Sequence, residues 1–244
     1  MHVEHHAWWS PALGQNMELK VYGHWGRPVL VFPSQDGRYY DFEGFGMAEA
    51  CCSLVDAGRV KFFAVDGIDF QSWTNKSLHP ADRARRHQQY ERHIVDEVVP
   101  FIERHTGLSS CWTTGCSMGA FHAANAFFRR PDLFDGVIGL SGLYRATAFT
   151  DGYSDDAIYF NSPLDYLPGL QDLWHLDRYR SARIAFAVGQ GAWEEDCLRD
   201  TRQLDEVIAA KGIPAWFDYW GTDVNHDWPW WRRMLPHLLA RLEV

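Results

Sequence analysis

The sequence predicts a single domain of the α/β class, with a mostly parallel central sheet flanked by helices. Seven short runs rich in β-branched and aromatic residues alternate with segments of helical periodicity, which is typical of parallel strands joined by crossover helices. The 244 residues suffice for one large domain and are few for two. The predicted strands are 19–22, 28–32, 60–65, 111–115, 137–141, 183–188 and 215–219.

The longest helical pattern covers residues 81–105, where Tyr90, Ile94, Val98 and Ile102 recur at helical spacing. We expect one long crossover helix there, kinked at Pro100 because proline lacks an amide hydrogen. Shorter amphipathic segments follow at 120–130 and 197–210, and another ends the chain.

Residues 145–180 interrupt the alternation of strands and helices. Turn signals such as Asp151-Gly152 and Pro168-Gly169 lie there among several aromatic residues, without a clear period. A long irregular stretch inside a compact domain is usually functional or mobile, so we expect an inserted cap or lid within the single domain.

Gly115-Cys116-Ser117-Met118-Gly119 is the most informative motif of the chain. A G-x-S-x-G sequence between a strand and a helix holds its serine on a strained turn, where the flanking glycines avoid clashes of Cβ atoms. The run before it favours a strand, and the alanine-rich segment after it favours a helix. The pattern predicts that Ser117 is a nucleophile, the alternative being a plain helix cap.

A serine nucleophile needs a base, and chain order indicates which histidine supplies it. In hydrolases with this turn, the histidine follows the last strand. His226 lies in a loop at that place, before the C-terminal amphipathic segment. His175 comes too early, inside the insert, and His237 lies on the predicted final helix.

The base needs an orienting carboxylate, which chain order places after a later strand. Strand 183–188 runs into a glycine turn followed by Glu194, Glu195 and Asp196. From the spacing between turn and acid, Glu194 is our first choice, Glu195 the second and Asp196 the third. The remaining acids would complement the dipole of the following helix.

Acyl transfer also requires two donors for the oxyanion. One is conventionally the amide after the nucleophile, here that of Met118. The second comes from the loop after strand 28–32, and we assign it to the backbone of Gln35, with Ser34 as the next choice. The alternative interpretation of this loop is a tight turn without a catalytic role.

Together these segments resemble the Putative esterase family of α/β-hydrolases, which includes esterase D-like enzymes and the antigen 85 acyltransferases. The resemblance implies the α/β-hydrolase fold and a serine esterase or acyl-transfer site with Ser117, His226 and a carboxylate at Glu194 or Glu195. The chain departs from many lipases in lacking a His-Gly-Gly-Gly oxyanion loop, so the resemblance does not assign a substrate class to this chain. The resemblance rests on residues 28–33, 115–120, 131–136, 140–142 and 226–228.

Composition excludes several other classes of protein. The net charge is −9 and the basic residues are scattered, so we expect no nucleic-acid partner. No run approaches the roughly 20 apolar residues of a membrane span, and the N-terminus lacks the pattern of an export signal. Five cysteines without a C-x-x-C pair suit reduced thiols, and hence a cytoplasmic protein.

Histidines near the N-terminus are the one hint of a metal site. His2, His5 and His6 form a terminal cluster without cysteine or carboxylate partners at ligand spacing. We expect this end to be frayed and solvated, and we expect neither a metal nor a cofactor.

The sequence therefore predicts a serine carboxylic-ester hydrolase that acts through an acyl-serine intermediate on a small-molecule ester. The alternatives are an acyltransferase on the same scaffold, and a non-catalytic binding module that uses the aromatic insert. The identity of the ester and the oligomeric state, a homo-oligomer included, stay open at this point.

Overall fold

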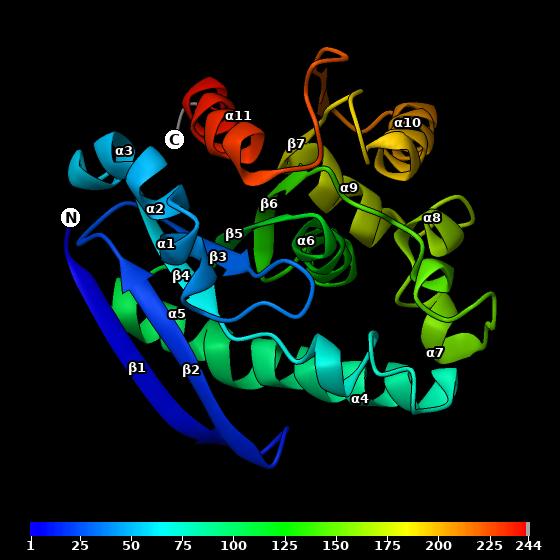
Figure 1. Ribbon diagram of the computed structural model, residues 1–244, viewed down its shortest axis with the longest axis horizontal. Helices are drawn as coiled ribbons and strands as arrows, with labels where there is room; N and C mark the ends of the chain where they lie inside the picture. The colour runs from blue at the N-terminus through cyan, green and yellow to red at the C-terminus, as the bar shows by residue number, and fades with distance from the viewer. Residues whose placement is uncertain (243–244) are drawn as a thin grey trace.

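The computed structural model describes residues 1–242 and contains a central eight-stranded sheet (Figure 1). The strand order is β1-β2-β4-β3-β5-β6-β7-β8. Strands β3 to β8 run parallel, whereas β1 and β2 are antiparallel to their neighbours. The strands are β1 Val3–Ser10, β2 Gln15–Tyr22, β3 Arg27–Phe32, β4 Val60–Val65, β5 Cys111–Cys116, β6 Phe134–Leu140, β7 Arg183–Val188 and β8 Trp216–Tyr219. The predicted α/β class and mostly parallel sheet are confirmed.

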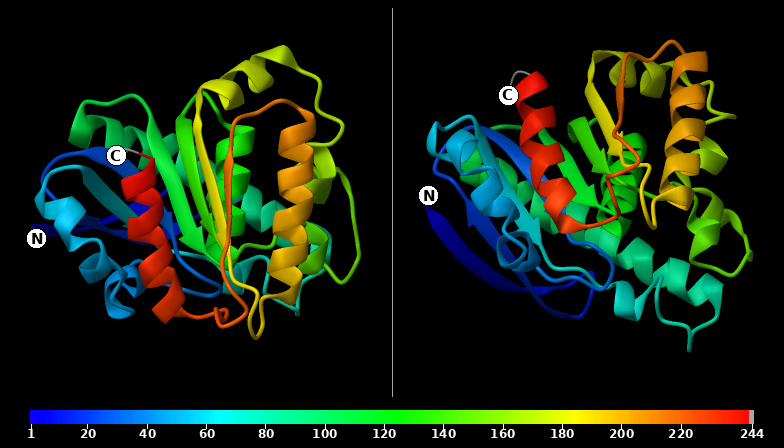
Figure 2. Two further views of the ribbon diagram at one scale, coloured as in Figure 1. Left: turned by 90° about the horizontal axis from the view of Figure 1, so that it is seen from above. Right: turned by 45° about the horizontal axis from the view of Figure 1, so that its top comes forward.

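Helices cover both faces of the sheet, as Figure 2 shows. Within β4, Phe62 and Ala64 face one apolar layer, and Phe63 and Val65 face the other. Because both faces are covered, β4 and β5 are buried along their whole length and lack the apolar–polar alternation of a half-exposed strand. The first layer contains α1 Asp41–Gly44, α2 Met47–Ala50, α3 Cys52–Asp56 and α11 Trp228–Arg241; the second contains α4 Pro80–His93, α5 Val99–Thr106, α6 Met118–Arg129, α9 Leu173–Ser181 and α10 Glu195–Ala210.

The crossover between β4 and β5 differs from a uniform helix. It consists of α4, a π-helical segment η2 (Ile94–Val98) and α5, all continuous in the chain. Pro100 lies in the first turn of α5, directly after η2, and cannot donate the amide hydrogen bond that a regular helix would need there. The irregularity expected at Pro100 therefore takes the form of a widened turn just before it.

Strand β1 is absent from the sequence-based prediction. It pairs with β2 over its whole length, from Val3 opposite Tyr22 to Ser10 opposite Gln15. The expectation that the N-terminal histidines form a frayed end is wrong, because they lie on this strand. Its alternate residues are only partly buried, so its hydrophobic pattern is weak and its existence depends on β2 as a partner.

The segment between β6 and β7 contains short helices rather than a structureless loop. They are the 3₁₀ turn η3 (Ala146–Ala148), α7 (Asp156–Tyr159) and α8 (Pro163–Tyr166), followed by α9. Helix α9 lies against β6, while α7 contacts α4 at one side of the molecule (Figure 1). A cap or lid function for residues 145–180 stays a prediction.

The five cysteines are free thiols. Burial raises the pKa of the Cys116 thiol, so this residue next to Ser117 stays protonated and fills space as a small apolar side chain. Within the described part of the chain, no helix has both the length and the apolar character to cross a lipid bilayer.

Gly119, at the start of α6, allows a close backbone approach between α6 and the end of β3. A Cβ atom there would lie 2.6 Å from both the Phe32 and the Pro33 carbonyl oxygens. We expect Gly119→Ala to destabilise the fold by about 1–3 kcal/mol, measured by denaturant unfolding. Gly44→Ala is the control, because a Cβ at Gly44 meets no atom within 4 Å. Equal stability of the two variants would contradict the prediction.

Candidate active site

Ser117 occupies the turn between β5 and α6 in a left-handed backbone conformation. Its φ is 56° and its ψ is −121°, values that a non-glycine residue adopts only when its surroundings enforce them. Gly115 and Gly119 meet directly beneath the turn, since a Cβ at Gly115 would lie 2.3 Å from the Gly119 carbonyl carbon. The Ser117 amide donates to the Leu140 carbonyl at 2.8 Å. This packing holds the serine at the carboxyl end of the sheet.

His226 reaches Ser117 from the loop between β8 and α11. Its Nε2 lies 2.8 Å from Ser117 Oγ, and its amide donates to the Ala192 carbonyl at 3.0 Å. Asp227 caps α11 by accepting from the Trp228 amide, which fixes the point where the loop enters the helix. The imidazole packs edge-on against the Trp231 indole, with ring centroids 4.9 Å apart. The histidine is thus positioned by both its backbone and its ring.

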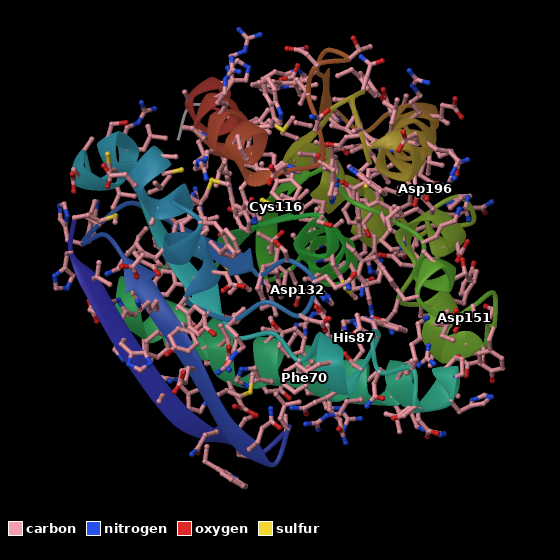
Figure 3. All side chains as sticks on the ribbon, viewed as in Figure 1. Phe70, His87, Cys116, Asp132, Asp151 and Asp196 are labelled. Carbon is pink, nitrogen blue, oxygen red and sulfur yellow. The ribbon has the colours of Figure 1, made fainter. Side chains whose placement is uncertain are left out.

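Glu194 lies behind His226 and is completely buried. It precedes α10 at the end of the turn after β7, and the His226 Nδ1–H donates to its Oε2 at 3.2 Å. Glu195 and Asp196 are exposed on the first turn of α10, and Asp196 pairs with Arg199. Figure 3 shows Asp196 on α10 toward the outside of the molecule, whereas Cys116, the neighbour of Ser117, lies near its centre. Of the three consecutive acids, the structure brings only Glu194 to His226.

Two residues that the sequence analysis did not single out, Ser141 and Trp231, also help to position Glu194. Ser141 Oγ donates to Glu194 Oε1 at 2.6 Å and accepts from Trp231 Nε1–H at 3.1 Å. Ser141 is fully buried with φ 49°, and its amide donates to the Ala187 carbonyl at 2.8 Å. The Leu140-Ser141-Gly142 segment contributed to the family resemblance, and its place directly after a strand was the signal that could have identified Ser141.

The two predicted oxyanion donors lie on the segments that meet at Gly119. Met118 is the first residue of α6, and Gln35 is exposed in the turn closed by the Gly37 amide and the Ser34 carbonyl at 2.9 Å. Within residues 1–242, neither the Met118 nor the Gln35 amide donates to a backbone carbonyl. Their role as oxyanion donors stays a prediction.

The remaining candidate side chains do not join this arrangement. His175 bonds to Asp172 at 2.6 Å and His237 lies 3.6 Å from Asp218. Cys197 Sγ lies 3.8 Å from His226 Nδ1, and burial raises the pKa of this thiol, so it is a neutral neighbour of the imidazole. Glu194, Cys197 and His226 have donor atoms close enough to share a metal ion, but here Glu194 orients an imidazole whose other nitrogen is bonded to Ser117 Oγ.

Comparison with known proteins agrees with this geometry. The model of the family described as "Putative esterase" matches residues 10–242, so the chain belongs to that family and is a carboxylic ester hydrolase by class. A search of curated protein sequences found no significant match.

Solved structures show that the fold is that of the α/β-hydrolases. A ferulic acid esterase is 17% identical, with a TM-score of 0.76 over 99% of this chain and 97% of that one. Mycobacterium tuberculosis MPT51 is 13% identical, with a TM-score of 0.74 over 99% and 98% of the two chains. The S-formylglutathione hydrolase of Staphylococcus aureus is 13% identical, with a TM-score of 0.70 over 99% of each.

The contacts of Ser141 predict that its hydroxyl holds Glu194 in place. Ser141→Gly suits the positive φ but removes both hydrogen bonds of the hydroxyl, so we expect kcat for a simple ester to fall about tenfold or more. KM should change little, whereas the melting temperature should fall, because the buried Glu194 Oε1 and Trp231 Nε1–H each lose a hydrogen-bond partner. Ser141→Ala, which keeps the backbone strain, should lose activity to a similar extent. Full activity of Ser141→Gly would show that the hydroxyl is not required.

Proposed function

We propose that this protein hydrolyses carboxylic esters through an acyl-serine intermediate formed on Ser117. The observation that carries the proposal is a continuous chain of hydrogen bonds, 2.8 Å from Ser117 Oγ to His226 and 3.2 Å from His226 to the buried Glu194. The chain begins at a serine with a strained backbone in a G-x-S-x-G turn. This combination of nucleophile, base and orienting acid is the arrangement that activates a serine.

Glu194 determines which nitrogen of His226 acts as the base. A carboxylate can only accept a hydrogen bond, so it holds the imidazole proton on Nδ1. Nε2 then carries a lone pair directed at the Ser117 hydroxyl. The negative charge of Glu194 also stabilises the imidazolium that forms when Nε2 takes the proton.

Acylation begins when Ser117 Oγ attacks the ester carbonyl carbon while His226 Nε2 removes the hydroxyl proton. The carbonyl oxygen becomes an oxyanion, which we propose accepts hydrogen bonds from the Met118 and Gln35 amides. Loss of one such donor typically costs about 2.7–4 kcal/mol of transition-state stabilisation. The carbon–oxygen bond to the leaving group then breaks, and His226 donates its proton to the departing alkoxide.

Deacylation repeats these steps with water in the place of the serine. His226 removes a proton from the water molecule, whose oxygen attacks the acyl carbon. The bond to Ser117 Oγ breaks, the serine recovers its proton from His226, and a carboxylic acid leaves. The enzyme returns to its starting state without a cofactor.

The nucleophile is tested by Ser117→Ala. We expect hydrolysis of p-nitrophenyl acetate to fall by roughly three orders of magnitude or more, and labelling by a fluorophosphonate probe to disappear, because Ser117 supplies the only hydroxyl among residues 1–242 that is bonded to His226 Nε2. The control is Ser53→Ala, on the exposed surface of α3. Near-normal hydrolysis by a folded Ser117→Ala variant would refute the proposed nucleophile.

The orienting acid is tested by comparing two neighbouring isosteric changes. Glu194→Gln removes the charge that stabilises the imidazolium and should lower kcat by at least about a hundredfold. Glu195→Gln changes an exposed side chain and should leave kcat within about twofold. If the larger loss followed Glu195→Gln, the proposed acid would be wrong, although the nucleophile and base would stand.

A further inference from the structure

A second group of side chains with metal-binding donor atoms lies at the β1 edge of the sheet, opposite the β8 edge. Glu4 and His6 of β1 meet His105 of α5, and one donor atom from each lies within 4.8 Å of the other two. The Nε2 atoms of His6 and His105 are each 3.0 Å from the same oxygen, Glu4 Oε2. Three strands separate β1 from β5, so this cluster is independent of Ser117.

The strand geometry of β1 creates the cluster. Residues two apart on a strand project from the same face, so Glu4 and His6 both point toward α5. Figure 1 shows α5 close to β1, and the His6 ring packs against Phe101 and His105. The sequence analysis found no carboxylate partner for the N-terminal histidines because it treated this segment as frayed; the strand supplies Glu4 as that partner.

The donor atoms suit a divalent transition metal. Two imidazoles and one carboxylate are a common zinc donor set that leaves one position open. Ligand atoms about 2.1 Å from one ion, at angles near 90–110°, lie about 3.0–3.4 Å apart, which agrees with the 3.0 Å separations here. The side chains of Glu4, His6 and His105 are 28%, 31% and 19% exposed, so an ion can enter from solvent.

A third histidine helps to hold the Glu4 carboxylate in place. His2 bonds to the other carboxylate oxygen at 3.0 Å and would orient Glu4 while its first oxygen binds the ion.

We propose that Glu4, His6 and His105 form a binding site for a divalent transition metal of the zinc type, completed by water. The ion joins the N-terminal hairpin β1–β2 to helix α5 on the far side of the sheet. The bound ion stabilises the β1 edge of the sheet, and the site takes no part in ester hydrolysis.

The positive charge of Lys61 should weaken metal binding, so replacing Lys61 tests the proposal. Its Nζ donates to His105 Nδ1 at 3.1 Å, which places the His105 proton on Nε2 in the metal-free protein. Coordination through Nε2 moves that proton to Nδ1, where it faces the Lys61 ammonium. The ammonium must then turn away from His105, toward the His24 carbonyl, 3.4 Å away. Removing the lysine charge should therefore strengthen the site.

The experiment titrates the EDTA-treated, dialysed full chain with zinc chloride, following heat and melting temperature. We expect one ion per chain and a higher melting temperature. His105→Ala, His6→Ala and Glu4→Gln should each weaken binding by more than about tenfold, since even second-sphere changes cost 10–100-fold. Lys61→Met should bind zinc more tightly than the wild type.

Two controls separate this site from other zinc ligands. His5→Ala changes a histidine on the opposite, exposed face of β1 and should bind zinc normally. His226→Ala removes a donor of the other cluster and should also retain the ion. Zinc binding that survives His105→Ala and Glu4→Gln, binding lost equally in His5→Ala, or a Kd weaker than about 1 mM in the wild type would overturn the proposal.

Discussion

Burial of the Glu194 carboxylate is the constraint on which the active-site architecture depends. An ionised carboxylate is costly to remove from water unless charge or hydrogen bonds compensate it. Here the compensation comes from His226 on one oxygen and from Ser141 and the Gly189 amide on the other, and Trp231 in turn donates to Ser141. Because these partners come from different elements, satisfying one buried charge also fixes the β6 end, the loop after β7 and the start of α11 relative to one another.

The parallel sheet makes this convergence possible. Strands β5, β6, β7 and β8 are consecutive neighbours, and the segment after each contributes one member of the site: Ser117, Ser141, Glu194 and His226 in that order. Parallel strands present all their carboxyl ends at one edge, where open α/β sheets bind ligands. The reactive groups thus need only short loops to meet, although they span more than a hundred residues of the chain.

Local sequence signals predict much of this arrangement, and the rest depends on contacts between segments that are distant in the chain. Ser117, His226 and Glu194 could be identified because a turn motif and chain order restrict each choice, and the structure brings the three together. Ser141 looked like an ordinary residue at a strand end, because its partner lies 53 residues later. Strand β1 was missed for a related reason: its polar, half-buried residues are stabilised by β2 and α5 rather than by their own pattern. No local signal decides the position of Gln35, which depends on how its loop docks against α6.

The order in which the four site segments appear along the chain has a consequence for biosynthesis. Ser117 is made first and His226 last, and α11, which follows His226, packs against β6 and α2. A nascent polypeptide that has completed β5 to β8 holds a serine with no proton acceptor until the loop before α11 settles on the sheet. Domains fold during synthesis from the N-terminus onward, so half-made chains on the ribosome carry Ser117 without His226 beside it. Under the proposed mechanism, catalytic activity then requires that the segments from β5 to α11 have all assembled.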